Sequence, residues 1–134
     1  MKKKLRKIII DEQEYLYCIK IQYHPGTDTS TLRLKVFLNR YKKTPLIIDF
    51  ITLNNYYVGQ PLKFGVALKN KITNSEEVVN LNEPGYIKQF IVHGQKSGWT
   101  GIKTFEIQNG LTYLEELGFE TDDLKIPNYS QKFS

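Results

Sequence analysis

The sequence predicts an α+β fold: an antiparallel sheet of about five strands in a meander, with one main amphipathic helix packed on one face and a short second helix. Over most of the first two-thirds of the chain, apolar and polar residues alternate, which is typical of an antiparallel sheet with one face in water. After residue 82 the apolar residues recur at helical spacing instead. The length of 134 residues suits one domain with its own core, and we expect residues 1–134 to form a single domain.

Strands are expected wherever the alternation persists for several residues. In the first of them, Tyr15, Tyr17 and Ile19 alternate with other side chains, so that one set faces a core and the other faces solvent. The run 46–53 is more uniformly apolar, as in a central strand. The expected strands are 15–23, 31–38, 46–53, 62–69 and 77–81.

Turn-forming residues separate these segments. Gly, Pro, Asn and Asp favour tight turns because they adopt, or stabilise, the backbone angles that turns need. A longer loop is expected at 54–61. The expected turns are 11–13, 24–28, 41–45 and 69–75.

The main helix is expected to begin after Asn82, a residue type favoured at the N-cap, and to end at Gly98. Its apolar stripe consists of Tyr86, Ile87, Phe90 and Ile91. A short strand at 105–107 is expected to follow. The second helix then begins at its cap, Asn109, and ends at Gly118.

The net charge of +5 is concentrated at the N-terminus. Five of the 19 basic residues lie within residues 1–7, so the rest of the chain carries 14 residues of each sign. We expect residues 1–7 to form a basic arm and residues 121–134, which lack apolar periodicity, to form a loose tail. Because residues 20–71 are mainly basic and residues 106–123 carry only acids, the domain is predicted to be a dipole.

The sequence contains no motif of a known catalytic or cofactor site, and we expect no cofactor or metal. A single cysteine, Cys18, excludes an internal disulfide and a multi-cysteine zinc site. The longest apolar runs, such as residues 8–10, are far shorter than the roughly 20 residues that cross a bilayer. They are also shorter than the apolar part of a secretory signal. We therefore expect a cytoplasmic protein without membrane contact, of open oligomeric state.

Asp49 is the most informative single polar residue. It lies on an apolar face of its predicted strand, and burying a carboxylate is unfavourable unless it is paired. We expect an ion pair with a base from a neighbouring strand, the candidates being Arg33, Lys35 and Arg40. His24 and His93 lie in no ligand or nucleophile motif, and Trp99 is expected to fill the core.

One segment resembles a known kind of protein. The run 82–91, followed by Gly98-Trp99 and residues 105–107, is similar to a segment of small uncharacterised bacterial proteins of immunity-like or accessory type. These have Pro-Gly at the start of an amphipathic helix and Gly-Trp at its end. The resemblance covers residues 82–107, about a fifth of the chain. It implies a binding partner of unknown identity rather than a reaction.

Three function classes stay open, and we place docking on another macromolecule first. The surface expected to bind a protein partner consists of acids and two aromatic anchors: Tyr113, Glu115, Glu116, Phe119, Glu120, Asp122 and Asp123. The second class is nucleic-acid binding by a basic, aromatic sheet surface, with contacts from Arg33, Lys35, Arg40, Lys42 and Lys43. The third is a small enzyme with an unrecognised pocket, for which the sequence names no catalytic residue.

Overall fold

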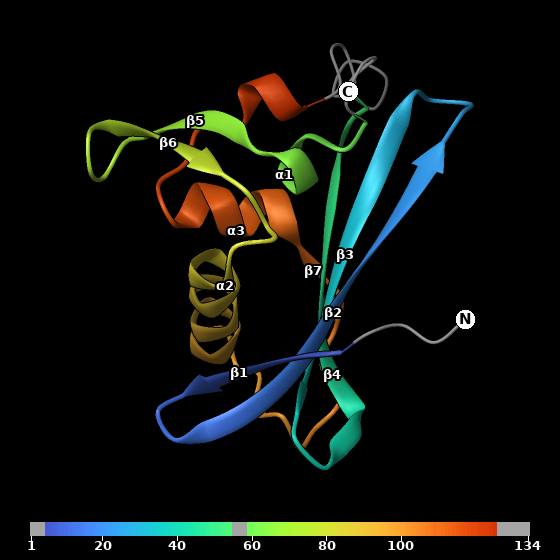
Figure 1. Cartoon of the computed structure of the whole chain (residues 1–134), viewed down its shortest axis with the longest axis vertical. Coiled ribbons are helices and arrows are strands. Elements are labelled where there is room, and N and C mark those ends of the chain that lie inside the picture. Colours follow the sequence, from blue (N-terminus) through green and yellow to red (C-terminus); the bar gives the residue numbers. More distant parts are fainter. Residues whose placement is uncertain (1–4, 55–58, 126–134) are drawn as a thin grey trace.

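A computed structural model shows an α+β fold, as the sequence predicts, and describes residues 5–54 and 59–125 (Figure 1). In chain order its elements are β1 (Arg6–Ile10), β2 (Gln13–His24), β3 (Thr29–Leu38), β4 (Tyr41–Leu53), α1 (Pro61–Phe64), β5 (Val66–Asn70), β6 (Ser75–Val79), α2 (Pro84–Lys96), β7 (Gln108–Asn109) and α3 (Gly110–Glu116). A short 3-10 helix over Asp122–Leu124 follows them.

Five strands form the main sheet in the order β1-β2-β3-β4-β7. The first four are antiparallel neighbours in chain order, because a short turn joins each strand to the next. β7 pairs in parallel with β4, through Ile48 with Gln108 and Asp49 with Asn109. A parallel neighbour needs a long crossover connection, which here contains α1, the β5-β6 hairpin and α2. The predicted sheet of about five strands is confirmed, but it is mostly rather than wholly antiparallel, because β7 is parallel to β4.

Two strands of the main sheet, β1 and β7, are not among the five strands expected from the sequence. The predicted strand 62–69 divides into α1 and β5. The Gln60 side chain caps α1 by accepting a hydrogen bond from the Leu62 amide, and Gly65 ends it at a φ of 103°, a value that favours glycine. The β5-β6 hairpin, which contains parts of the expected strands 62–69 and 77–81, forms a separate two-stranded sheet, and β1 and β7 complete the main sheet instead. The strand expected at 105–107 is likewise replaced by β7.

The turn predicted at 41–45 is also corrected, because these residues form the start of β4. The turn itself lies at Asn39 and Arg40, the latter with a φ of 80°. Thr44 is held from a distant segment: its hydroxyl donates to the Gly101 carbonyl at 2.6 Å, and its carbonyl accepts from Trp99 Nε1 at 3.1 Å. These tertiary hydrogen bonds override the local turn preference. Trp99 is buried, as expected.

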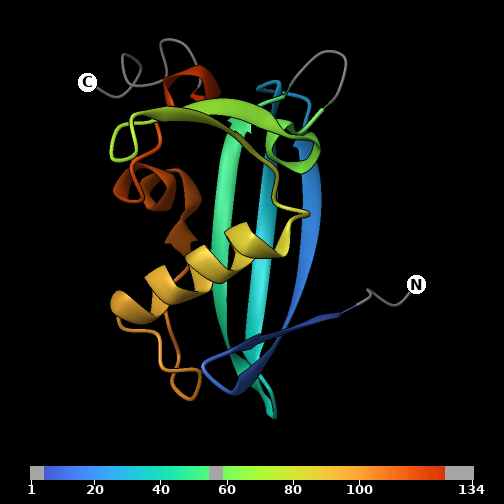
Figure 2. The same cartoon turned by 60° about the vertical axis from the view of Figure 1, so that its left-hand side comes forward.

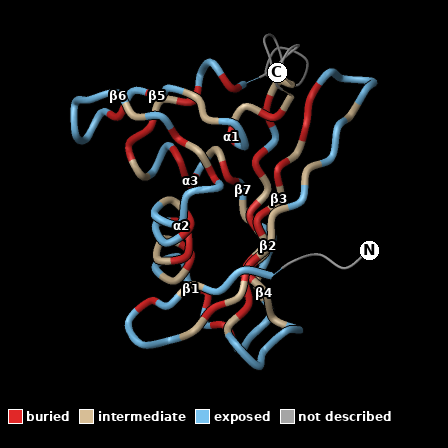
Figure 3. Tube along the Cα trace, viewed as in Figure 1, coloured by how far each residue is buried: buried red, intermediate tan, exposed pale blue. Residues whose placement is uncertain are grey.

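The core lies between the main sheet and α2, which crosses one face of the sheet (Figures 1 and 2). Buried residues concentrate on the facing sides of these two layers (Figure 3). Along the two central strands the buried residues alternate, as the pleat requires: Leu32, Leu34 and Val36 in β3, and Leu46, Ile48 and Phe50 in β4. Ile87, Phe90 and Ile91 of α2 are buried against them. Gly94 lies where an added Cβ would be 2.6 Å from Leu46 Cδ2, so glycine permits this close approach.

The two ends of the chain differ from their predicted roles. Arg6 and Lys7, expected in a basic arm, belong to β1, and residues 1–4 lie outside the described residues. The prediction of a loose tail is corrected for residues 121–125, because Leu124 is buried and Lys125 forms an ion pair with Glu115 at 2.8 Å. Residues 126–134 lie outside the described residues.

Replacing Phe90 tests the contact between α2 and the sheet. Phe90→Ala is expected to lower the free energy of unfolding by about 3–5 kcal/mol, because it removes a fully buried ring that packs on Phe50. Denaturant unfolding followed by circular dichroism measures the change. Gln89→Ala, on the exposed side of the same helix, is the control and is expected to change it by less than about 0.5 kcal/mol. Equal losses in the two variants would contradict this packing.

Candidate functional site

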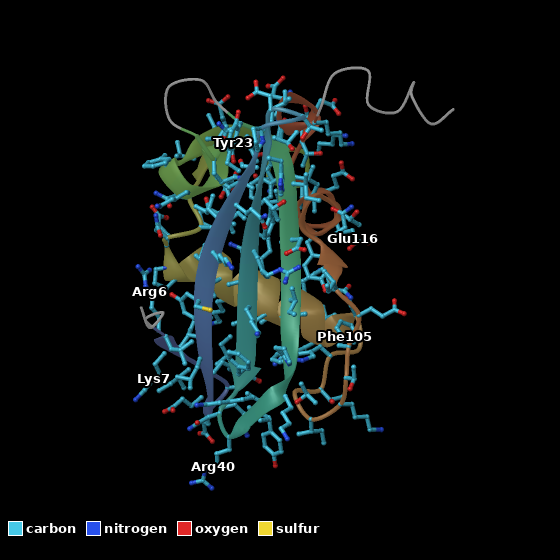
Figure 4. The ribbon with its side chains drawn as sticks, turned by 90° about the vertical axis from the view of Figure 1, so that its right-hand side faces the viewer. Arg6, Lys7, Tyr23, Arg40, Phe105 and Glu116 are labelled. Carbon is cyan, nitrogen blue, oxygen red and sulfur yellow. The ribbon has the colours of Figure 1, made fainter. Side chains whose placement is uncertain are left out.

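The main sheet has a second face, opposite the one that α2 covers. Over this face lies no helix among residues 5–54 and 59–125 (Figure 4, in which it is turned toward the viewer). We call it the outer face. Its middle is formed by side chains that alternate with the buried ones: Cys18, Lys20 and Gln22 from β2, Thr31, Arg33 and Lys35 from β3, and Ile47, Asp49 and Ile51 from β4.

An ion pair between Arg33 and Asp49 occupies the middle of the outer face. The two residues are directly opposite in the register of β3 and β4. Arg33 Nε donates to Asp49 Oδ1 at 2.8 Å, and Nη2 donates to Oδ2 at 2.9 Å. This fork satisfies both oxygens of a carboxylate that is only 18% exposed, which offsets the cost of removing it from water. The hydrogen bond to Asp49 raises the pKa of Arg33. The predicted ion pair is confirmed, with Arg33 as the base.

A pocket of about 680 Å³ lies beside this ion pair, between the strands and the start of α3. Asp49 contributes to its wall, and also to the wall of a smaller hollow of about 190 Å³ that includes Lys20 and Gln22. The two hollows therefore adjoin at Asp49. Together they extend over β2, β3 and β4 toward α3.

The pocket combines an apolar patch with hydrogen-bonding groups. Ile51 and Ile107 line it and are 50% and 56% exposed, and the half-buried Leu111 lies beside them. The polar residues Thr27, Thr29 and Thr112 also line the pocket. Such a mixture of apolar surface and a few polar groups is typical of sites that bind side chains or small ligands.

Glu115 and Lys125 form a second ion pair on the pocket wall, with Lys125 Nζ 2.8 Å from Glu115 Oε2. The Thr121 hydroxyl also donates to this carboxylate. The hydrogen bond from Lys125, and then that from Thr121, lowers the pKa of Glu115. Both carboxylates that line the pocket, Glu115 and Asp49, therefore have a cationic partner.

The acidic surface predicted to bind a protein is only partly assembled. Tyr113 and Phe119, expected as exposed anchors, are each 3% exposed. This is a correction, and its reason is that α3 and the segment after it turn their apolar residues into the core. Glu116 Oε1 lies 2.7 Å from Nε2 of His93, whose ring packs edge-on against Tyr113. The other predicted acids have no ion-pair partner among the described residues: Glu120, Asp122 and Asp123.

The predicted nucleic-acid surface is divided between two places. Arg33 and Lys35 lie on the outer face, together with Lys20, which lies directly opposite Arg33. The remaining bases lie in or next to the turn between β3 and β4, at one end of the sheet (Figure 4): Arg40, Lys42 and Lys43.

The aromatic rings that base stacking requires are mostly buried on the strands that carry these bases. Tyr15 and Tyr17 of β2 are 6% and 2% exposed and belong to the core. Phe37 is 8% exposed, and Lys35 Nζ lies 5.3 Å from the centre of its ring. Two rings of these strands are exposed: Tyr41, 48% exposed and next to Arg40 and Lys42 in the chain, and Tyr23, 49% exposed near the end of β2.

Reactive groups are sparse in the part of the chain that the structure describes. It contains no cluster of three or more His, Cys, Asp or Glu residues that suits a metal ion. His24 Nε2 lies 2.7 Å from the Thr31 hydroxyl, and Cys18 is a half-buried free thiol. Among the same residues, no helix has both the length and the apolar character needed to cross a membrane.

Sequence reasoning missed most of the pocket because its walls come from distant segments. The alternation in β4 places Ile51 on the same face as Asp49, but it says nothing about their neighbours. Ile107 and Lys125 reach the pocket only because β7 pairs in parallel with β4 and α3 follows directly. No local signal predicts that pairing, since β7 has only two residues.

Comparisons of the chain with protein-family models, with curated proteins and with solved structures found no match.

Breaking the central ion pair tests its contribution to stability. Asp49→Asn is expected to lower the free energy of unfolding by about 1–3 kcal/mol, because the neutral amide leaves the Arg33 charge unpaired and offers one acceptor oxygen in place of two. Urea denaturation measures the change. The control is Lys7→Gln, which breaks an exposed pair with Glu14 at 3.5 Å and is expected to cost less than about 0.5 kcal/mol. If Asp49→Asn lowered the free energy of unfolding by no more than this control, the pair of Arg33 and Asp49 would contribute no more to stability than an exposed ion pair does.

The pair of Glu115 and Lys125 is expected to make stability depend on pH. Because the folded-state pKa of Glu115 is lowered, its contribution is present above the unfolded pKa of about 4.3 and is lost as pH falls through the folded value. Glu115→Gln should therefore melt at a lower temperature than wild type at neutral pH and at nearly the same temperature at about pH 2–3. Asp123→Asn, which breaks no ion pair in the described structure, serves as the control. A difference in melting temperature that persists in acid would contradict the assignment.

Proposed function

We propose that the protein is a binding protein that docks a partner polypeptide on its outer face, with an apolar side chain of the partner in the pocket beside Asp49. The observation that supports this is the pocket of about 680 Å³ on a sheet face that no described helix covers. Exposed Ile51 and Ile107 provide the apolar contact area. Apolar anchors that enter pockets of this kind supply most of the binding energy in protein interfaces.

The charges of the outer face favour an acidic partner. Arg33 and Asp49 neutralise each other, whereas Lys20 and Lys35 take part in no ion pair among the described residues. A partner segment with acidic residues beside its apolar anchor would complement these two lysines, and such complementarity speeds association and selects partners. The acidic surface, by contrast, would suit a basic partner.

Two observations lower the rank of docking through the acidic surface. Its expected anchors, Tyr113 and Phe119, are buried. Two of its carboxylates, Glu115 and Glu116, are already within hydrogen-bonding distance of Lys125 and His93. Nucleic-acid binding is supported by the lysines and by only two exposed rings of the basic strands, Tyr23 and Tyr41, which lie at strand ends rather than in the middle of the outer face. A role as an enzyme receives less support, because both carboxylates in the pocket have cationic partners.

The cytoplasmic location and the bacterial immunity-like or accessory role stay part of the proposal.

Replacing an exposed pocket residue tests the docking proposal. A photo-crosslinking amino acid at position 51 or 107, introduced into the full chain in its native host, is expected to form an adduct with a specific protein. The matched control is position 78, because Val78 is also an exposed, β-branched strand residue that lies outside the main sheet. Adducts identified at 51 and 107 but not at 78 support the proposal. The same adducts at all three positions, or none at 51 and 107, contradict it.

Binding affinity gives the second measurement once the crosslinked partner is purified. Ile51→Asp is expected to weaken binding at least tenfold, because a charge enters the apolar contact, whereas Val78→Asp is expected to leave it unchanged. Lys20→Glu together with Lys35→Glu is expected to slow association. Titration of labelled oligonucleotides provides the alternative outcome: micromolar binding at physiological salt that the double lysine variant abolishes would place nucleic acid first.

A further inference from the structure

Among the described residues, the C-terminal half of β2 pairs with a strand on one side only, the side of β3. β1 pairs only with residues 13–17 of β2, while β2 continues to His24. Within residues 5–54 and 59–125, no strand pairs with residues 18–24 on the side away from β3 (Figures 1 and 4). Seven residues of a long strand thus form an open sheet edge, which we call the β2 edge.

The backbone of the β2 edge presents a regular set of donors and acceptors. In an antiparallel sheet the N–H and C=O of one residue point to one neighbouring strand, and those of the next residue point to the other. The Glu14 carbonyl accepts a hydrogen bond from the Asn39 amide at 3.0 Å, which lies on the β3 side. The backbone N–H and C=O groups of the even-numbered residues of β2 therefore point to β3. It follows that Ile19, Ile21 and Tyr23 each direct an N–H and a C=O to the β2 edge.

The β2 edge lacks the devices that usually prevent strand pairing. Natural edges are protected by several charges, by proline, by bulges or by short length. Residues 18–24 carry one charge, Lys20, and no proline, and their register with β3 is continuous. By contrast β1, the other strand on this side of the sheet, is short and begins with Arg6 and Lys7.

We propose that the β2 edge pairs with the β2 edge of a second copy of this chain, so that two main sheets join in antiparallel fashion. A two-fold axis at Ile21 sets Ile21 opposite its own counterpart. It also sets Ile19 opposite Tyr23, Lys20 opposite Gln22 and Cys18 opposite His24 of the second copy. The three odd-numbered residues then satisfy their free backbone groups across the axis.

This register is self-complementary, which favours a second copy over an unrelated strand. The pairs Ile21–Ile21 and Ile19–Tyr23 are aliphatic or aromatic, and pairs of these kinds stabilise sheets. The only charge, Lys20, faces an amide rather than another lysine. Because the contact uses the edge of the sheet and not its outer face, the inference stands independently of the proposed docking function.

The self-association is measured by sedimentation of the full chain over a range of concentrations, with two variants of the exposed Gln22. Gln22→Glu sets a carboxylate opposite Lys20 of the second copy, and Gln22→Lys sets an ammonium group there. Because the contact occurs twice, Gln22→Glu is expected to tighten the dimer roughly 2- to 30-fold and Gln22→Lys to weaken it by a similar factor. The control is Gln89 on the exposed side of α2, where the same two substitutions are expected to have no effect.

A disulfide tests the register directly. In the proposed dimer Cys18 lies opposite residue 24 in a pair without mutual hydrogen bonds, whose Cα atoms are about 4.5 Å apart, and this separation suits a disulfide. Mild oxidation of His24→Cys is expected to give a covalent dimer on a non-reducing gel, whereas Thr73→Cys, in the exposed β5-β6 turn, is expected not to. A wild-type chain that stays monomeric at all concentrations, equal effects of the two Gln22 variants, or equal crosslinking at positions 24 and 73 overturns the proposal.

Discussion

The ring of Phe50 is the contact on which the rest of the structure depends, because it joins β4 to two helices. It packs edge-on against Phe90 of α2, with the ring centres 5.1 Å apart. It also lies directly against Gly110, the first residue of α3, where an added Cβ would overlap the ring. Gly94 of α2 approaches Leu46 in the same way. A large residue on the sheet thus meets a small residue on a helix at both places, and this complementarity sets how near the helices lie to the sheet.

Once the helices cover one face of the sheet, the pleat decides the character of the other. Successive side chains of a strand point to opposite faces, so the residues between the buried ones of β3 and β4 form the outer face. Asp49 is one of these outer-face residues. Its surroundings are partly apolar, because Ile47 and Ile51 flank it on the same face. Arg33, which lies opposite Asp49, offsets the cost of placing a carboxylate there by donating two hydrogen bonds to it. The ion pair therefore stabilises the sheet, and among the described residues Lys20 and Lys35 form no ion pair.

The pocket and the β2 edge have a common origin in the unequal lengths of neighbouring strands. β4 has 13 residues but β7 has only two, and the pocket lies where β7 ends and α3 begins. β2 has 12 residues but β1 has five, and the β2 edge begins where β1 ends. Long central strands beside short outer ones leave backbone groups and side chains without neighbours. In this fold both candidate interaction surfaces arise in that way.

Local physical chemistry allowed the sequence by itself to determine the fold class, the alternation of the long strands, the helix that Asn109 caps, the burial of Trp99 and the pairing of Asp49. These features depend on the period of apolar residues, on turn and cap preferences and on the cost of burying a charge, all of which act over a few residues or across one strand pair. Only the tertiary structure decided that 62–69 divides at Gly65, that Tyr113 and Phe119 are buried, and that a two-residue strand pairs in parallel with β4. Each of these depends on contacts between residues far apart in the chain, whose free energy no local pattern contains.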